Sequence, residues 1–137
     1  MGCSRAQAMS ESLESPWQQT SLLPLVAPPK VSADQLLILD TETTGLDPEV
    51  DQVLEVGAIL FSVPQRAVLA QLSFLLPVEA NAAEPLNGIS AGATQAPQPW
   101  QPSLQLLQQF ASSAQLAVAH NAAFDRQWFG HGALPDL

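Results

Sequence analysis

The chain has 137 residues and is 47% hydrophobic, which is enough for one domain with a buried core. Its formal net charge is −9. Residues 1–30 sum to zero, so all of this charge falls in residues 31–137, where Arg66 and Arg126 are the only basic side chains. Such a chain cannot hold a polyanion through Lys and Arg contacts, and a nucleic-acid partner would need bound cations or a further segment.

The single cysteine, Cys3, excludes an internal disulfide and a metal cage built from cysteines. No apolar run reaches the roughly 20 residues that span a bilayer. The first segment, MGCSRAQAMS, has no apolar core and therefore does not match a secretory signal. The sequence predicts a cytoplasmic protein without a membrane segment.

The first predicted unit is a flexible leader. Residues 1–33 are rich in Ser, Gln, Ala and Pro, and Pro24, Pro28 and Pro29 prevent a continuous helix. Order is expected to begin near residue 34, so residues 34–137 form the predicted domain.

Three strands are predicted at the start of this domain. Residues 35–41 (QLLILDT) are a continuous apolar run, which is typical of a central strand covered on both faces. Residues 52–62 alternate loosely between two faces, and residues 66–76 are a third strand candidate. The short connection VPQ between these two suits a hairpin turn.

A long loop is predicted next, because five prolines fall between residues 77 and 102. Residues 85–94 could hold one short helical turn within it. Residues 103–113 place apolar side chains at helical spacing, with Ser103 as the N-cap. Residues 114–120 are short and apolar and predict a fourth strand.

A second helix is predicted over residues 121–132, with Asn121 as its N-cap and Gly130 or Gly132 near its end. The element order is therefore strand, strand, strand, helix, strand, helix. Three sequential strands joined by tight turns, followed by a helical crossover to a fourth, predict an α/β fold with a mixed sheet.

Asp40 and Glu42 carry the first chemical signal, because they stand at the end of an apolar strand. Side chains two residues apart share a face of a strand, so both carboxylates point the same way. They are hard oxygen ligands of the kind that Mg²⁺ and Mn²⁺ take. Carboxylates are seldom buried without a partner, so a positive charge is expected nearby. Two solvated carboxylates at a strand end are the alternative for this pair alone.

A second polar cluster follows the fourth predicted strand. Asn121 and Asp125 are four residues apart, so they lie one above the other on a helix. Phe124 and Trp128 form a neighbouring pair at the same spacing and can anchor that helix on the sheet. Asp125 is then expected at the rim of the core. The alternative is an exposed helix carboxylate, free or paired with Arg126.

Together the two clusters resemble a known family. LILDTETTGL (37–46) resembles the first motif of the DEDD-type 3′–5′ exonucleases, the superfamily of the polymerase III epsilon proofreading subunit and ribonuclease T. AHNAAFDRQWF (119–129) resembles the second motif, with its His-Asn-x-x-Phe-Asp core. PLNGISAGAT (85–94) resembles the segment between them. The resemblance covers about residues 34–132.

The resemblance implies a ribonuclease-H-like mixed sheet flanked by helices, and a site for two divalent cations, Mg²⁺ or Mn²⁺. In that scheme Asp40 bridges both ions, Glu42 binds one, and Asp125 binds the other. Two ions about 4 Å apart can stabilise the attacking and leaving oxygens of a phosphodiester. The cations would also explain how so acidic a chain can bind a nucleic acid, since they neutralise carboxylates and bind the scissile phosphate.

The resemblance further implies a role for the loop after the first strand. Backbone amides of Thr43, Thr44 and Gly45 would hold the 3′ end of a single-stranded DNA or RNA substrate, and Leu46 would wedge against its terminal base. Asn121 is counted with these substrate-binding residues. The choice between DNA and RNA, and any polymerase or repair partner, stays open.

One family motif has no clear counterpart. The family places a His general base and, five residues later, a fourth acidic ligand on a helix that follows a further strand and helix. His131 and Asp136 have this spacing, but they begin only six residues after Asp125, and Pro135 would interrupt a helix. We therefore expect a loop histidine and a near-terminal aspartate, in a chain truncated before its third motif, with a missing C-terminal strand and helix portion and weak or no activity.

Two other interpretations remain from the sequence alone. The first is a non-catalytic interaction module that keeps the nuclease fold. The second takes LDTETTG as the Asp-x-Asp-x-Thr loop of an aspartyl-phosphate phosphatase, although Glu42 replaces the second Asp.

Overall fold

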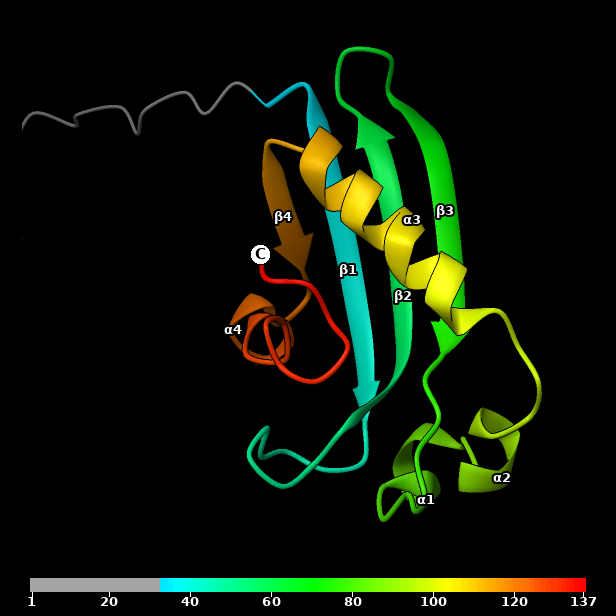
Figure 1. Cartoon of the computed structure of the whole chain (residues 1–137). Helices are drawn as coiled ribbons and strands as arrows, with labels where there is room; N and C mark the ends of the chain where they lie inside the picture. Colours follow the sequence, from blue (N-terminus) through cyan, green and yellow to red (C-terminus); the bar gives the residue numbers. More distant parts are fainter. Residues whose placement is uncertain (1–32) are drawn as a thin grey trace, which may run out of the picture. The chain divides into compact units, whose positions relative to one another are not determined.

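The computed structural model describes residues 33–137, which form a four-stranded mixed sheet with helices packed on one face (Figure 1). The flexible leader predicted over residues 1–33 lies, apart from Ala33, outside the described residues. The strand order is β3-β2-β1-β4. The strands are β1 (Gln35–Thr43), β2 (Val53–Ser62), β3 (Ala67–Leu75) and β4 (Leu116–Ala119).

The strand pairing follows from the connections. β1 and β2 are antiparallel and are joined by a loop over residues 44–52, which is longer than the tight turn that the sequence predicted. β2 and β3 are antiparallel and are joined by a short turn over residues 63–66. β4 lies parallel to β1 and is reached through the crossover helix α3. The predicted α/β class with a mixed sheet is therefore confirmed.

Four helices lie in the described residues, and their bounds correct the predicted ones. They are α1 (Glu84–Asn87), α2 (Ala91–Thr94), α3 (Trp100–Ser113) and α4 (Ala122–Arg126). α1 and α2 occupy the segment in which a single helical turn was expected. None of the four has the length and apolarity that crossing a membrane requires.

The predicted start of α3 was wrong. The helix begins at Trp100, with Pro99 at the N-cap position. Ser103 lies inside the helix, where its hydroxyl donates a hydrogen bond to the Pro99 carbonyl at 3.1 Å. Proline is tolerated in the first turn of a helix, so Pro102 does not delay the start.

The predicted end of α4 was also wrong. The helix ends at Arg126, because the chain then tightens into turns in which Trp128 and Phe129 donate to carbonyls three residues back. Gly130 has φ 86°, which turns the chain away from the helix path.

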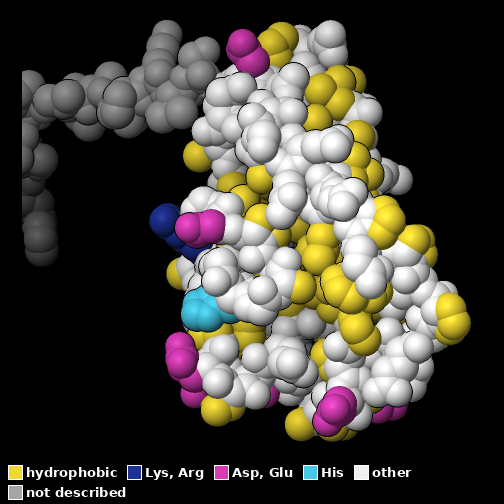
Figure 2. All heavy atoms as spheres, in the orientation of Figure 1, with side chains coloured by type: hydrophobic (Ala, Val, Ile, Leu, Met, Phe, Trp, Pro, Cys, Tyr) yellow, Lys and Arg dark blue, Asp and Glu magenta, His cyan; other side chains and the backbone are white. Residues whose placement is uncertain are grey.

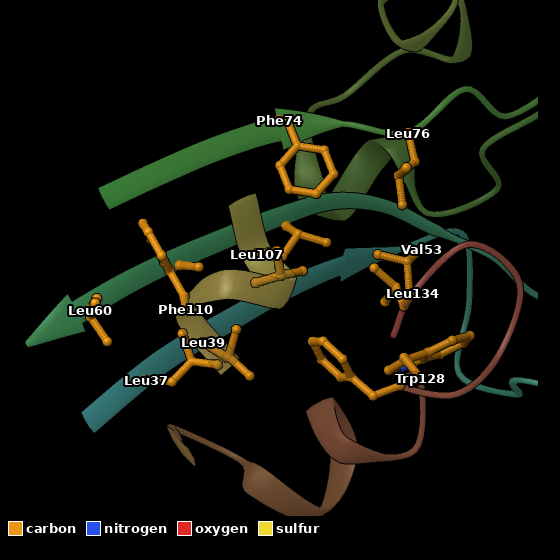
Figure 3. Close-up of a cluster of buried hydrophobic side chains, with 13 residues drawn as sticks. Leu37, Leu39, Val53, Leu60, Phe74, Leu76, Leu107, Phe110, Trp128 and Leu134 are labelled. Carbon is orange, nitrogen blue, oxygen red and sulfur yellow. The ribbon is translucent and has the colours of Figure 1, made fainter. Parts of the chain in front are cut away.

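The core lies between the sheet and the helices α3 and α4 (Figure 3). In β1 the buried side chains Leu37 and Leu39 alternate with the exposed Ile38 and Asp40. β2 alternates in the same way, as its sequence predicts. The expectation that β1 is covered on both faces was wrong for the described part of the chain, because helices pack on only one face of the sheet.

Candidate active site

The open face of the sheet carries the first two candidate residues. β1 buries Leu39 and Thr41 on the helix side, so Asp40 is exposed on the opposite face and Glu42 is half-buried there. The β2 residue opposite Asp40 is Gly57. Since glycine has no side chain, Asp40 stands beside open space, and it lines a hollow of about 470 Å³ on this face.

Asp125 is hydrogen-bonded to Thr41, which lies between Asp40 and Glu42 on β1. The Thr41 N–H donates to Asp125 Oδ1 at 3.1 Å, and the Thr41 hydroxyl donates to the same oxygen at 2.9 Å. The Asp125 side chain is only 5% exposed. The alternative of an exposed helix carboxylate is therefore wrong, and Asp125 lies at the rim of the core as expected.

Two aromatic side chains anchor α4 in this place. Phe124 and Trp128 meet edge to face with ring centroids 5.8 Å apart. Trp128 is buried in the core cluster, and Phe124 packs against that cluster. The anchoring role predicted for this pair is confirmed.

The carboxylates at this end of the sheet repel one another. The pKa of Glu42 is raised above its ordinary value, first by burial and then by the negative charges of Asp40, Glu55 and Asp125. Glu55 faces Glu42 directly across the β1–β2 pair. Like charges in opposed positions destabilise a sheet, and a bound cation would relieve the repulsion.

The donor set fits a divalent cation in kind, because carboxylate oxygens are the ligands that Mg²⁺ and Mn²⁺ prefer. The distances between these carboxylates do not yet match those of a metal site. Within residues 33–137, no group of three His, Cys, Asp or Glu side chains lies close enough together to hold an ion. The charges of Asp40 and Asp125 contribute to the raised pKa of Glu42, so the three carboxylates interact electrostatically. Their role as joint metal ligands stays a prediction.

The loop after β1 uses several of its polar groups internally. The Thr43 hydroxyl donates to the Gly45 carbonyl at 2.6 Å, and the Thr44 N–H donates to the Gln52 carbonyl at 2.9 Å. Leu46 is 79% exposed, so its side chain is free to meet a ligand. In this structure the Thr44 amide is not available to a substrate, and the binding roles of this loop stay predictions.

Sequence reasoning missed two residues that support the loop. Asp51 accepts hydrogen bonds from Thr44 Oγ1 and from the Asp47 N–H. Asn87 Nδ2 donates to the Thr43 carbonyl at 3.2 Å and so ties α1 to the end of β1. The available signal for Asn87 was the Asn-Gly turn dipeptide, because Gly88 adopts φ 73° after the helix. No sequence signal indicated the contacts of Asp51.

Three candidates remain. Asn121 holds the N-cap position of α4, but its side chain makes no cap hydrogen bond. His131 is exposed in a turn and lines a hollow together with Trp128. Asp136 is exposed near the last residue and shares no helix with His131. The expectation of a loop histidine and a near-terminal aspartate is confirmed.

Solved nucleases share this fold. E. coli exonuclease I in complex with a dT13 oligonucleotide matches 69% of this chain with a TM-score of 0.59 and 17% identity. The nuclease domain of 3′hExo, a DEDDh family member, bound to rAMP, matches 72% with a TM-score of 0.55 and 15% identity. The matched region spans 22% of the exonuclease I chain and 57% of the 3′hExo chain. The fold is therefore the ribonuclease-H-like fold of exonucleases.

The family model described as an exonuclease of the RNase T type matches residues 37–133. The chain belongs to this family, and so to the DEDD-type exonuclease superfamily. A search of curated proteins gave no match. The family match decides against the phosphatase-loop interpretation.

Proposed function

We propose that the chain is a metal-dependent 3′–5′ exonuclease domain that hydrolyses phosphodiester bonds at the 3′ ends of single-stranded nucleic acid. The observation that carries this proposal is the pair of hydrogen bonds from Thr41 to Asp125. These bonds bring the acidic residue of the second motif to the strand that carries Asp40 and Glu42.

Three carboxylates would hold two Mg²⁺ or Mn²⁺ ions. Asp40 and Glu42 approach from the open face of β1, and Thr41 orients the Asp125 carboxylate from the buried face. When bound, such ions stabilise charge on the attacking and leaving oxygens and supply hydroxide at neutral pH. The chain's own contribution is to hold and orient the carboxylates, and the ions offset its negative charge.

The loop after β1 would receive the 3′-terminal nucleotide. Within residues 33–137, the N–H groups of Gly45 and Leu46 have no acceptor, and the Leu46 side chain is exposed. We assign Thr43, Thr44 and Asn121 to the same binding region. The oligonucleotide on exonuclease I and the rAMP on 3′hExo support a single-stranded DNA or RNA substrate. A cytoplasmic location also belongs to this proposal.

We expect slow turnover from this chain, because His131 does not lie on the open face with Asp40. A single-stranded oligonucleotide labelled at its 5′ end should shorten stepwise from the 3′ end in Mn²⁺. Asp40→Ala should abolish this shortening, whereas Glu49→Ala, which alters an exposed loop carboxylate, should not. Degradation that survives Asp40→Ala, or that proceeds from the 5′ end, would contradict the proposal.

One observation favours the non-catalytic interaction module as a second candidate. Within the described part of the chain, no three metal-ligating side chains lie at ligand spacing. Calorimetric titration with Mn²⁺ separates the two functions. The nuclease requires Mn²⁺ binding that Asp125→Asn weakens, whereas the module requires no such binding.

A further inference from the structure

Asp51 closes the loop that follows β1. Its Oδ1 accepts a hydrogen bond from Thr44 Oγ1 at 3.2 Å, and its Oδ2 accepts one from the Asp47 N–H at 3.1 Å. The Asp51 N–H also donates to the Asp47 carbonyl at 2.8 Å. Both carboxylate oxygens therefore point into the loop, one to each end of the segment 44–47.

Gly45 lies against the same carboxylate. A Cβ atom on Gly45 would overlap the Asp51 side chain, so that one of the two would have to move. Gly45 is not among the glycines with positive φ. The reason for a glycine here is thus the close approach of Asp51, and not a left-handed backbone.

The loop that Asp51 closes has backbone and side-chain groups that are free to contact a ligand. The N–H groups of Gly45 and Leu46 find no acceptor within residues 33–137, and Leu46 is 79% exposed. This loop directly follows β1, which carries Asp40 and Glu42. Each Asp51 oxygen accepts a hydrogen bond inside the loop, so the contacts of Asp51 support the shape of the loop.

We propose that Asp51 is a positioning residue, which fixes residues 44–47 in the shape that receives the 3′-terminal nucleotide. This inference rests on the function proposed above. Glu49, which is exposed in the same loop, serves as the control position. In the conservative variant Asp51→Asn one of the two carboxylate oxygens is replaced by an NH2 group, so one of the two donors, which meet different oxygens, would lose its acceptor.

The test measures two affinities of the 137-residue chain and its variants: that for Mn²⁺ alone, and that for a single-stranded dT oligonucleotide in saturating Mn²⁺. Asp51→Ala should weaken oligonucleotide binding on the order of tenfold and leave Mn²⁺ affinity unchanged. Asp51→Asn should fall between this variant and the original chain. Glu49→Ala should change neither affinity.

A double-mutant cycle tests the close approach itself. Gly45→Ala should weaken oligonucleotide binding in the original chain, but should have little effect in the Asp51→Ala background, where the overlapping carboxylate is gone. Additive effects of the two substitutions would overturn the inference. So would equal oligonucleotide affinity of Asp51→Ala and the original chain, or a parallel loss of Mn²⁺ affinity.

The failure of this inference can be told apart from failure of the proposed function. If the original chain binds neither Mn²⁺ nor the oligonucleotide, the proposed function fails and the role of Asp51 fails with it. If the original chain binds both and Asp51→Ala binds equally well, only the inference fails. Should Asp51→Ala not fold, Asp51→Asn and amide exchange at Asp47, whose N–H donates to Asp51, carry the test, and an unchanged exchange rate overturns the inference.

Discussion

Thr41 holds the candidate site together at the scale of single residues. Its side chain lies on the buried face of β1, between two carboxylates on the open face. Both its N–H and its hydroxyl bind one oxygen of Asp125. A strand and a helix 84 residues apart in the chain are thereby joined at a single atom.

Thr41→Val tests this junction. The substitution keeps the shape of the side chain but removes the hydroxyl, leaving a buried carboxylate oxygen with one donor instead of two. We expect the free energy of unfolding to fall by about 1–3 kcal/mol, measured by urea denaturation. Thr41→Ser retains the hydroxyl and should recover most of the loss. Equal destabilisation by both variants would show that packing matters here and the hydrogen bond does not.

The raised pKa of Glu42 should make the stability of the metal-free chain depend on pH. Its pKa in the folded chain is raised above the ordinary value of 4.5, so the folded state binds the proton more tightly than the unfolded state does. This carboxylate therefore destabilises the fold above its raised pKa, and the cost disappears as pH falls through that pKa and below 4.5.

Glu42→Gln should accordingly raise the Tm at neutral pH in the presence of a chelator, and the gain should vanish below pH 4.5. Circular dichroism melting at a series of pH values measures both. Glu49→Gln, in the exposed loop, is the matched control. A gain that persists unchanged in acid would refute the electrostatic explanation.

At the scale of elements, the sequence predicted the strands better than the helix ends. Period-two burial in β2 was readable because Leu54, Val56 and Ala58 alternate with less apolar residues. β1 was misread as covered on both faces because Leu36 and Ile38 are apolar although they lie on the open face. Apolar composition alone does not tell which face of a strand other elements will cover.

The candidate site was predictable only in part, because some of its contacts join elements that are far apart in the sequence. The motif resemblance selected Asp40, Glu42 and Asp125 as candidates, and the anchoring of α4 by Phe124 and Trp128 followed from their spacing of four. The Thr41–Asp125 bonds depend on how α4 packs against β1, which no local pattern encodes. The contacts of Asp51 were missed because they arise from the path of an irregular loop.

The segment after α4 adds a side chain to the core. Leu134 is 6% exposed and belongs to the same buried cluster as Trp128. We expect Leu134→Ala to lower the free energy of unfolding by about 2–5 kcal/mol, which is a large part of a typical margin of about 5–15 kcal/mol. Leu86→Ala, at a position 90% exposed, should change it by about 0.5 kcal/mol or less. Equal effects would mean that the segment does not pack here.

At the scale of the whole molecule, charge governs what the chain can bind. Residues 31–137 carry the net charge of −9 with two arginines as their only basic side chains. On the side that carries α3, basic atoms are visible at one edge only, whereas acidic side chains occur at several places (Figure 2). Residues 31–137 could therefore attract a nucleic acid electrostatically only through bound cations.

Removal of divalent ions should abolish nucleic-acid binding altogether. In EDTA, fluorescence anisotropy with a labelled single strand should show no binding even at low salt, and Mn²⁺ should restore it. Mn²⁺ should not restore nucleic-acid binding in the Asp40→Asn variant, because this substitution weakens the cation site. Binding in EDTA that weakens steeply as salt increases would reveal a basic surface that residues 33–137 do not provide.

The position of β4 has a consequence for how the chain behaves at high concentration. Within residues 33–137 this strand forms one edge of the sheet, and its sequence LAVA contains neither a charge nor a proline. Such edges offer unpaired backbone groups to any extended segment that meets them. We expect self-association by strand addition at this edge at high concentration, despite the net negative charge of the chain.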